Sequence, residues 1–517
     1  MKSGNATKEL YKQLRALPWP QLWEHEVPQF DRAEARARFE RVAVVRAVGV
    51  VFSESGPPAQ REAVKQWLVR LLGDPEEKIR RYAMAALPKI GVGAREEAEL
   101  LALLRKTTNE REEKFLTRTL GRVGGAATLD TLEAAGGHSV QRVKATVARA
   151  QRPTIIRMDR HVSDISGMRI HLRGRRGLEG IVREEVEARG KFRVVEVSPG
   201  LVAITPLAAF TLDDVFELRC FDTVGFVLGE VKSRDQAELI EALAATIASP
   251  ASRRLLETLT DGAIRYRLDF IGRGHQRGAV REVAERAFAL CPLILNDARQ
   301  SPWAVDIHPA AAGHTVELRP RFAPDPRHAW RLDDVPAASH PPLAACMARL
   351  AGPMEREIAW DPFCGSALEL IERSRLGGVL RVHGTDHDAD AIRAARANFA
   401  AARLDRVESR FTCCDFREFP TVARIAPRSL TLIITNPPLG RRLQIPNLRG
   451  LFEDLFAVAA DLLAPGGRLV FTNPLRMDSP EPTLKLQSSQ AVDLGGFDCR
   501  LEVYRKSAAG AVVAGRA

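Results

Sequence analysis

Asp361 begins a loop whose residue types suit a ligand that carries an amino group. The loop Asp361-Pro362-Phe363-Cys364-Gly365-Ser366 follows a strand predicted over residues 358–360. In a doubly wound parallel sheet, ligands bind at the carboxyl ends of the strands. We therefore expect Asp361 to hold an ammonium group and Gly365 to let the backbone approach the ligand closely.

Two further acids follow the next two predicted strands. Asp386 comes just after residues 381–384, and Asp415 comes after residues 408–412. A carboxylate in the first of these positions accepts hydrogen bonds from ribose hydroxyls, and we expect the second to accept one from an adenine amino group. A glycine-rich turn alone fits any nucleotide-binding fold, whereas three acids in order favour an adenosyl cofactor. The predicted cofactor-binding residues are Asp361, Phe363, Cys364, Gly365, Ser366, Asp386, Asp415 and Asn436.

The segment Asn436-Pro437-Pro438-Leu439-Gly440 directly follows an apolar strand predicted over residues 430–435. A conjugated exocyclic amine is a poor nucleophile because its lone pair is delocalised into the ring. If the Asn436 side-chain oxygen and the Pro437 carbonyl accept its two N–H bonds, the nitrogen moves towards tetrahedral geometry. Its lone pair can then attack a sulfonium methyl, so that catalysis rests on positioning and electrostatics without a strong general base.

These motifs together predict transfer of a methyl group from S-adenosylmethionine to an exocyclic amine. The predicted catalytic residues are Asn436, Pro437, Pro438 and Leu439, the last packing near the acceptor base. The alternative is a proline-rich turn that follows a strand and has no catalytic role.

A C-terminal domain over residues 346–506 must position these residues. Its predicted strands alternate with helices that start near Ser366, Ala389 and Leu448. Such βαβ alternation predicts an α/β, Rossmann-like domain with a doubly wound parallel sheet. We expect residues 500–504 to add an antiparallel strand, and residues 507–517 to form a disordered tail. The predicted parallel strands cover residues 358–360, 381–384, 408–412, 430–435 and 468–472.

Residues 153–325 mix strands and helices in an α+β region, and a linker over residues 326–345 follows. Runs that alternate apolar and polar residues predict the strands. Helices are predicted over residues 177–186 and 279–289. The predicted strands cover residues 169–172, 192–197, 201–204, 263–270, 303–307 and 315–318.

Residues 31–150 read as short amphipathic helices in tandem. One helix has Asp74 as its expected N-cap and Gly91 at its C-terminal end, and a second begins at Asn109. Helix pairs at this spacing resemble HEAT-type repeats, which stack to bury a shared core. The alternative is a plain helical bundle without a partner.

The composition is that of a globular chain of several domains, with 517 residues of which 45% are hydrophobic. No apolar run approaches the roughly 18 residues of a membrane span, and the N-terminus lacks a signal-peptide core. The seven cysteines include no C-x-x-C pair. We therefore expect a cytoplasmic protein without a metal site.

Most of the basic excess lies near the N-terminus. Residues 1–150 carry 26 Lys and Arg against 19 Asp and Glu, which is +7 of the net charge of +11. A polyanionic partner would explain this charge, and so would an arginine-rich genome composition.

Taken together, the motifs resemble those of the class I methyltransferases of the THUMP-domain RNA family, which methylate the N2 amino group of guanosine. The resemblance spans roughly residues 160–506 and is most specific at Asp361–Ser366 and Asn436–Gly440. The other matching stretches are Gly177-Leu178-Glu179 with Glu184-Glu185 in the ferredoxin-like domain, Arg265-Tyr266-Arg267 to Arg277 with Val280-Arg281-Glu282-Val283 in the THUMP domain, and Trp330-Arg331-Leu332 and Pro341-Pro342-Leu343 in the linker.

The resemblance implies that the ferredoxin-like and THUMP domains bind structured RNA, usually the acceptor stem of tRNA, and that guanine N2 in tRNA is methylated. A protein partner could bind the helical repeats. Arginines near glycine-rich loops are candidates for phosphate contact, although each by itself fits a solvated surface residue. The candidates are Arg173, Arg175, Arg176, Arg273, Arg277 and Arg281.

Two departures from the family pattern leave other functions open. The family has a glycine and a threonine where this chain has Ala367 and Leu368, and often an aromatic residue where it has Leu439. Loss of base stacking at Leu439 would cost about 1–3 kcal/mol. The alternatives are methylation of adenine N6, methylation of ribosomal RNA, or an RNA-binding scaffold without turnover.

Overall fold

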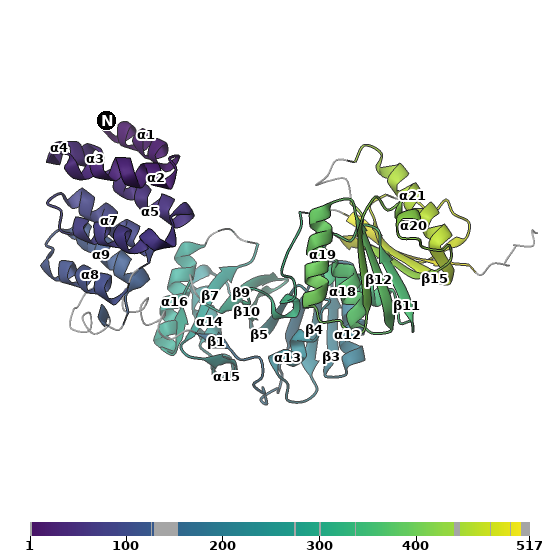
Figure 1. Cartoon of the computed structure of the whole chain (residues 1–517). Helices are drawn as coiled ribbons and strands as arrows, with labels where there is room; N and C mark the ends of the chain where they lie inside the picture. Colours follow the sequence, from purple (N-terminus) through teal and green to yellow (C-terminus); the bar gives the residue numbers. More distant parts are fainter. Residues whose placement is uncertain are drawn as a thin grey trace, which may run out of the picture. The chain divides into compact units, whose positions relative to one another are not determined.

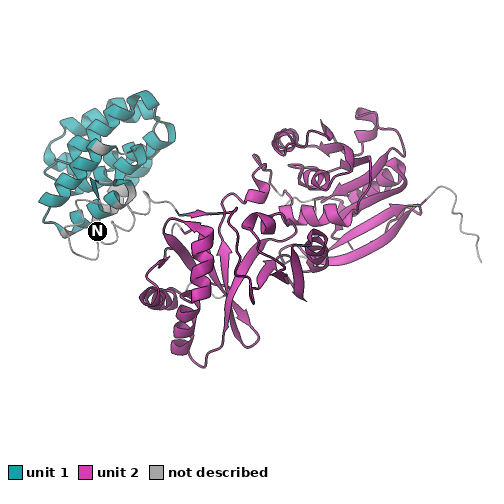
Figure 2. Ribbon diagram, turned by 90° about the horizontal axis from the view of Figure 1, so that it is seen from below, with its two compact units in different colours: residues 1–154 teal, residues 155–517 magenta. Residues whose placement is uncertain are grey.

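The chain divides into two compact units, Met1–Thr154 and Ile155–Ala517 (Figure 2). The computed structural model describes residues 3–91, 93–125, 127–128, 154–272, 274, 276–298, 301–336, 338–438, 445–475, 477–496 and 498–507. The predictions for residues 129–150, for Arg273, Leu439 and Gly440, and for the tail after Ser507 lie outside these residues. No helix within the described ranges is long and apolar enough to cross a membrane.

The first unit is a stack of helices, which confirms the predicted helical N-terminal region (Figure 1). Helices α1, α5, α7 and α9 form one row, and α6 and α8 pack beside it against α7 and α9. The elements are α1 (Ser3–Arg15), α2 (Trp19–Gln21), the π-helix Leu22–Glu26, α3 (Val27–Arg32), α4 (Ala35–Glu40), α5 (Ala43–Ser55), the 3₁₀ turn Pro58–Gln60, α6 (Arg61–Leu71), α7 (Glu77–Ile90), α8 (Ala94–Lys106) and α9 (Glu110–Val123).

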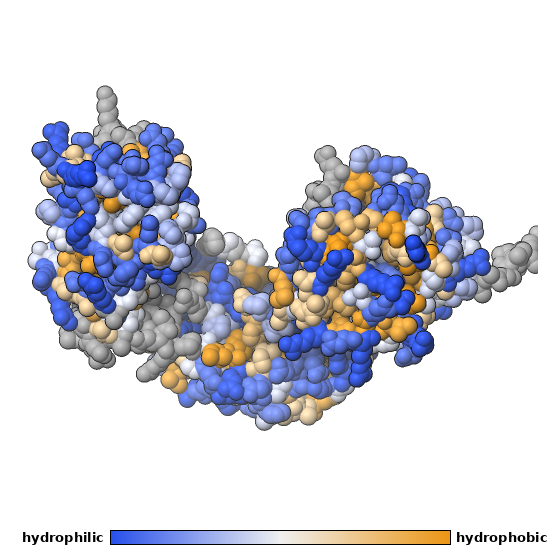
Figure 3. Space-filling view, in the orientation of Figure 1, coloured by the Kyte–Doolittle hydropathy of each residue, from blue (hydrophilic) through white to orange (hydrophobic). Residues whose placement is uncertain are grey.

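Apolar side chains from successive helices of this unit share one core. Trp19 stacks on Trp23 with ring centroids 5.3 Å apart, and Phe30 meets the edge of Trp67 at 6.0 Å. The visible face of the unit in Figure 3 is mostly hydrophilic, with apolar residues scattered over it. Most of these helices therefore contribute one apolar side to an interior shared with their neighbours, and α4 is an exception, since it has no buried residue.

The predicted helix ends of this unit are correct at two of three positions. The Asn109 side chain accepts hydrogen bonds from the backbone N–H groups of Arg111 and Glu112, which confirms it as an N-cap. Gly91 ends α7 with a φ of 103°, a conformation that glycine adopts without steric cost. Asp74 is not the N-cap of α7, because it closes a turn with the N–H of Glu76, and Glu76 takes the cap position.

The second unit contains an eight-stranded mixed sheet in the order β3-β4-β2-β5-β10-β9-β7-β8. All six strands predicted in this region are present, whereas β5, α14 and α15 were not predicted. The strands are β2 (Ile170–Arg173), β3 (Phe192–Ser198), β4 (Leu201–Pro206), β5 (Thr223–Val231), β7 (Ile264–Phe270), β8 (Ile294–Asn296), β9 (Trp303–Ala310) and β10 (Gly313–Pro320). A short pair is formed by β1 (Ile155–Ile156) and β6 (Thr260–Asp261), and the helices are α12 (Glu179–Arg189), α13 (Leu212–Phe216), α14 (Gln236–Ile247), α15 (Pro250–Leu259) and α16 (Arg277–Leu290).

The same unit contains a seven-stranded sheet in the order β13-β12-β11-β14-β15-β17-β16. The first five strands are parallel and β17 is antiparallel to both neighbours, which confirms the predicted doubly wound sheet and its closing strand. The strands are β11 (Glu357–Asp361), β12 (Val379–Asp386), β13 (Glu408–Cys413), β14 (Leu430–Thr435), β15 (Leu463–Asn473), β16 (Leu484–Asp493) and β17 (Asp498–Lys506). The helices are α17 (Pro341–Leu350), α18 (Leu368–Arg375), α19 (Ala389–Ala401), α20 (Phe419–Val422) and α21 (Leu448–Leu462), and a 3₁₀ turn covers Pro326–His328.

Both faces of this second sheet are covered. Side chains of α18 and α19 pack with Ala359 and Val382 in one core, while side chains of α20 and α21 pack with Trp360 and Ile433 in another. Strand residues that alternate along β11 therefore enter different cores, as expected of a parallel sheet buried on both sides.

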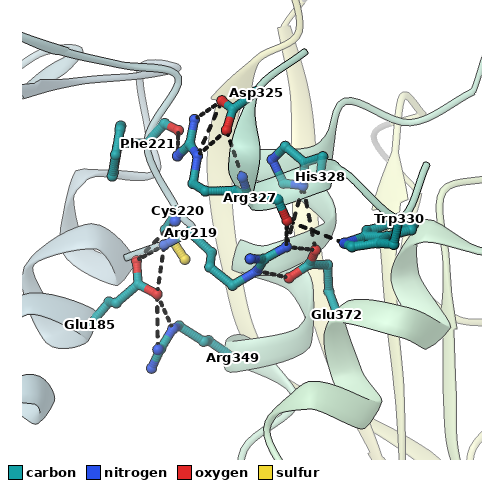
Figure 4. A network of polar contacts seen from close by, with 10 residues as sticks. All are labelled: Glu185, Arg219, Cys220, Phe221, Asp325, Arg327, His328, Trp330, Arg349 and Glu372. Carbon is teal, nitrogen blue, oxygen red and sulfur yellow. Dashed lines mark hydrogen bonds and ion pairs between the residues drawn. The ribbon is translucent and has the colours of Figure 1, made fainter. Parts of the chain in front are cut away.

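A polar network joins the two sheets through Arg219, in the segment between α13 and β5 (Figure 4). Its guanidinium donates from Nε and Nη2 to the two oxygens of Glu372 on α18, each at 2.6 Å. Nη2 also donates to the Arg327 carbonyl at 2.8 Å. Glu185 on α12 accepts from the N–H of Arg219 and from the guanidinium of Arg349 on α17. These paired charges connect the eight-stranded sheet to helices that cover the seven-stranded one.

Replacing Glu372 by alanine should lower the free energy of unfolding by about 3–5 kcal/mol, because it leaves the mostly buried Arg219 guanidinium without its carboxylate. Denaturant unfolding of the full chain measures the change. Arg393→Ala is the matched control, since it removes a pair with Asp390 in which both side chains are at least 66% exposed; its effect should stay below about 1 kcal/mol. Equal shifts for both variants would contradict a structural role of the network.

Candidate active site

Asp361 ends β11 and is fully buried. Its Oδ1 accepts the backbone N–H of Phe363 at 3.0 Å, while its Oδ2 is buried without a hydrogen-bond partner. Burial, and next the charge of the nearby Glu369, raise the pKa of Asp361 well above the ordinary carboxyl value. A buried acid with a vacant lone pair gains most from a cationic partner, so this carboxyl fits the ammonium group for which the sequence predicts it.

The loop after Asp361 turns sharply into α18. Gly365 has a φ of 47°, and its N–H donates to the Asp386 carboxylate at 3.1 Å. Thr385 on β12 anchors the loop by donating to the Pro362 carbonyl at 3.1 Å. Ala367 also lies in the left-handed region, with a φ of 66°, where its methyl group costs about 1–2 kcal/mol relative to glycine. The loop therefore adopts the tight turn at Ala367 despite the side chain there.

The remaining loop residues, Cys364, Ser366 and Phe363, are buried or half-buried. Cys364 is buried, which raises the pKa of its thiol, and its Sγ would lie 3.0 Å from a Cβ placed on Gly384. Ser366 is buried with an Oγ that has no hydrogen-bond partner. Phe363 is half-buried, and its ring centroid lies 5.0 Å from that of Phe416. Phe416 directly follows Asp415 in the sequence, so the Phe363 ring packs beside the loop that contains Asp415.

Asp386 and Asp415 differ in how free they are to accept a ligand. Asp386 is half-buried, and it accepts the N–H groups of Gly365 and Asp388. Asp415 is more exposed, and its two oxygens accept from the backbone N–H and the guanidinium of Arg417, at 2.9 and 2.8 Å. A hydrogen bond from adenine to Asp415 stays a prediction, which would use the carboxylate's remaining lone pairs.

Asn436 directly follows β14, which is the neighbour of β11 in the sheet. Because the two strands are parallel, Asn436 and Asp361 lie at the same edge of the sheet, where the strands end. Its Nδ2 donates to Ser339 Oγ at 2.9 Å, and its Oδ1 accepts from Thr472 Oγ1 at 2.5 Å. Pro437 is buried and Pro438 is half-buried. An amide oxygen with a second lone pair thus lies at the same edge of the sheet as the buried carboxyl of Asp361.

Several residues around the site were not predicted from the sequence. Ser339 precedes α17, and its hydroxyl donates to Glu369, a buried acid in the first turn of α18. Burial raises the pKa of Glu369. Val335, in the same segment as Ser339, would lie 3.5 Å from a Cβ placed on Gly365. The one signal available in the sequence was a glutamate at position 369, inside the otherwise apolar start of a buried helix.

The arginines predicted to contact RNA occupy different environments. Arg173 is held within the protein, since it and His171 both bond to Glu317 on β10. Burial raises the pKa of Glu317, but these hydrogen bonds outweigh burial and lower it to about 2. Arg175 donates to the carbonyl of Asp493 at 3.3 Å.

Three of the predicted arginines are exposed, namely Arg176, Arg277 and Arg281, although Arg281 pairs with Glu285 at 2.8 Å. RNA contact by any of these side chains stays a prediction. In the part of the chain that the structure describes, no three His, Cys, Asp or Glu side chains converge as a metal site requires.

Residues 328–493 match a family model described as "RMKL-like, methyltransferase domain". Among curated proteins, a probable tRNA (guanine(10)-N2)-dimethyltransferase of Methanothermococcus thermolithotrophicus is 27% identical over 139 residues, which are 26% of this chain and 82% of that protein. The tRNA (guanine(10)-N2)-dimethyltransferase of Methanothermobacter thermautotrophicus is 28% identical over 147 residues, 28% of this chain and 40% of that protein. A ribosomal RNA large subunit methyltransferase K/L of Syntrophotalea carbinolica is 36% identical over 104 residues, 19% of this chain and 14% of that protein.

Two solved structures resemble about two thirds of this chain. TrmN from Thermus thermophilus superposes with a TM-score of 0.53 at 23% identity, over 66% of this chain and 99% of that one. A possible methylase from Clostridium difficile 630 has a TM-score of 0.50 at 16% identity, over 66% and 98%. At these identities the likeness shows a shared fold. The fold, the acidic strand ends and the family match together define a methyltransferase domain, whose cofactor is S-adenosylmethionine.

Proposed function

We propose that this protein is an S-adenosylmethionine-dependent RNA methyltransferase that acts on an exocyclic amino group, with guanine N2 in tRNA as the acceptor. The observation that carries the proposal is the pair of neighbouring strand ends. β11 ends at the buried carboxyl of Asp361, whose Oδ2 has no hydrogen-bond partner, and β14 is followed by the Asn436 amide, whose oxygen keeps a lone pair beyond its bond from Thr472.

Asn436 and Pro437 prepare the acceptor in this mechanism. Bound S-adenosylmethionine supplies an electrophilic methyl group. The Asn436 Oδ1 and the Pro437 carbonyl accept the two N–H bonds of the amine, which withdraws its lone pair from the ring and directs it for attack. Asp361 holds the ammonium of the cofactor, and Asp386 accepts from its ribose hydroxyls. The proton leaves nitrogen readily once it is alkylated, so no strong base is required.

Two observations support RNA as the substrate: the names of similar proteins, and the domains that precede the seven-stranded sheet. Two aligned relatives are named as tRNA guanine-N2 dimethyltransferases. We propose that residues 155–325 contain the ferredoxin-like and THUMP modules, which bind structured RNA in the family that the sequence resembles. The paired rows of helices in residues 3–123 fit HEAT-like repeats, and we propose that this basic unit binds RNA or a protein partner.

A second candidate function is favoured by one specific observation. Ala367 takes a left-handed conformation in the cofactor loop, which is the conformation that suits glycine. A strained loop and the apolar Leu439 fit an RNA-binding scaffold that no longer turns over. Adenine N6 and ribosomal RNA remain alternative acceptors, because the Asn436 contact is the same for any conjugated amine.

Calorimetry with S-adenosylmethionine, followed by incubation with total RNA and labelled cofactor, tests the proposal. We expect micromolar binding, since typical KM values lie between about 1 μM and 1 mM, and a labelled N2-methylguanosine in digested tRNA. No cofactor binding would contradict both enzyme hypotheses. Binding without transfer to any RNA would favour the scaffold, and labelled N6-methyladenosine would change the acceptor.

Deleting residues 1–154 should weaken RNA binding by about tenfold or more and leave cofactor affinity within about twofold. The deleted unit contributes +7 over residues 1–150, and phosphate contacts dominate RNA affinity, whereas the predicted cofactor residues all lie in residues 361–436. Filter binding over a series of salt concentrations measures the affinity for RNA. A shallower dependence of affinity on salt would indicate lost phosphate contacts. Unchanged RNA affinity would instead make the unit structural.

A further inference from the structure

The Asn436 amide is held from both sides by hydroxyl groups of other elements. Ser339 accepts from Nδ2 at 2.9 Å, and Thr472 on β15 donates to Oδ1 at 2.5 Å. Ser339 in turn donates to Oε1 of Glu369 on α18. Ser339 and Thr472 thus hold the Asn436 amide directly, and Glu369 acts on it through Ser339.

In the series of hydrogen bonds from Asn436 through Ser339 to Glu369, the donor and the acceptor of each bond are fixed. An amide nitrogen can only donate, so Ser339 Oγ must accept from Asn436 and its own proton is free for another acceptor. Glu369 takes that proton, and it is only 3% exposed, so bulk water does not compete for it. The amide is therefore fixed with Nδ2 towards Ser339 and Oδ1 away from it. One lone pair of Oδ1 stays available beyond the bond from Thr472.

We propose that Ser339 and Glu369 are positioning residues that orient the Asn436 amide so that its oxygen accepts the N–H of the acceptor amine. This inference rests on the proposed methyl transfer and adds two residues that act through Asn436. If the amide could rotate, it would also present its N–H₂ group to the amine. Because this group is a donor, it repels the N–H of the amine, whereas the amide oxygen accepts from it.

Glu369 is poorly explained as a stabilising residue. Leu368, Leu370 and Ile371 supply the apolar side of this part of α18, and a buried carboxyl is costly unless it is well paired. The charge of Glu369 also adds to the burial that raises the pKa of Asp361. Its hydrogen bond to Ser339 gives this buried acid a role at the site.

Ser339 belongs to a segment that is itself part of the site. At its start, the buried Asn398 of α19 accepts the N–H groups of Leu332 and Asp333, at 2.8 and 3.0 Å. Val335 then lies beside Gly365 of the cofactor loop. The segment is thus held at both ends, by Asn398 and by the Ser339 contacts, and it can place a hydroxyl with little freedom.

Kinetics of three variants test the role. At saturating cofactor, Ser339→Ala should lower kcat by about tenfold or more, with the KM for RNA and the cofactor Kd within about twofold. Glu369→Leu should show a similar loss of kcat, and Glu369→Gln, which keeps an oxygen that accepts from Ser339, should recover most of it. The control is Ser374→Ala, which removes a buried hydroxyl that bonds to the Leu370 carbonyl of its own helix; its kcat should not change.

Side-chain amide NMR supplies a readout that does not depend on turnover. The chain has seven asparagines, and Asn436→Asp identifies the Nδ2 signals of Asn436. Ser339→Ala should shift these signals and speed their exchange with water, whereas Ser374→Ala should leave them in place. Unchanged kcat or unchanged amide signals in Ser339→Ala would overturn the inference. If the wild type methylates no RNA, the proposed function fails, and the amide signals alone then decide whether Ser339 holds Asn436.

Discussion

Replacing Asn436 by alanine should lower the rate of methyl transfer by about 10²–10³-fold at saturating cofactor, the usual cost of removing one preorganised polar contact from a reacting group. Its Oδ1 is the side-chain acceptor available to the amine at the end of β14. Cofactor affinity should stay within about threefold, because the three acids assigned to the cofactor, Asp361, Asp386 and Asp415, lie at the ends of other strands. Single-turnover rates and calorimetry separate the two effects.

Asn436→Asp is the matched control for this prediction. Aspartate keeps an oxygen that Thr472 and the amine can both approach, so it should retain more activity than alanine. It also places a carboxylate beside Ser339, which can donate to it instead of to Glu369. An alanine variant as active as the wild type would contradict the assigned role, whatever the activity of the aspartate variant.

Asp361→Asn should weaken cofactor binding by about 10–100-fold, since a hydrogen bond to a charged group contributes about 1.5–3 kcal/mol and 1.4 kcal/mol is a factor of ten. Asparagine keeps the contact with the Phe363 N–H but removes the charge at the buried Oδ2. Calorimetry measures the loss, with Asp390→Asn on the exposed start of α19 as the control. Equal affinities for wild type and Asp361→Asn would show that the ammonium binds elsewhere.

The raised pKa of Asp361 gives this prediction a pH dependence. Folding favours the protonated acid, so its contribution to stability is present below the ordinary carboxyl pKa and is lost as pH rises through the raised one. A cationic ligand favours the ionised acid, and cofactor affinity should therefore rise over that same pH window. In Asp361→Asn the rise should be reduced, and the ligand-free protein should be more stable at neutral pH. Thermal unfolding and calorimetry across pH check both signs.

The catalytic sheet was predictable because its local signals agree. The strand over residues 430–435 was predicted with its observed bounds, since an apolar run ends at an Asn-Pro-Pro turn. Parallel strands end at one edge of a sheet, so the alternation predicted Asp361 and Asn436 at the same edge. The structure supplied the strand order that makes β11 and β14 neighbours.

The eight-stranded sheet was less completely predicted, and β5 shows why. This strand contains Gly225 and Gly229, which weaken the pattern of a strand. The structure supplies the reason for the first of them, because a Cβ on Gly225 would lie 2.4 Å from Oε2 of Glu317. The glycine makes room for a buried charge on a strand nearly a hundred residues later.

The arginines illustrate the same limit at the surface. Arg173 ends β2 and Arg175 follows it, in a basic, glycine-rich stretch that suggests phosphate contact. In the fold, Arg173 pairs with Glu317, and Arg175 bonds to the backbone at Asp493, which ends β16. Both partners lie more than a hundred residues away, so no local pattern could indicate that these guanidinium groups are already engaged.

By itself, the sequence determined the class of the C-terminal sheet and the positions of acids at its strand ends and of the asparagine that follows β14, because periodicity and strand-end motifs are local properties of the chain. Only the tertiary structure decided what surrounds that asparagine. Ser339, Glu369 and Thr472 belong to a connecting segment, a helix and a strand that carry no shared motif. Ser339 and Thr472 contact Asn436, and Glu369 acts through Ser339, because α18 and β15 pack against β14 and α17 packs against both of them. Hydrogen-bond partners are fixed by distances in space, and packing sets those distances.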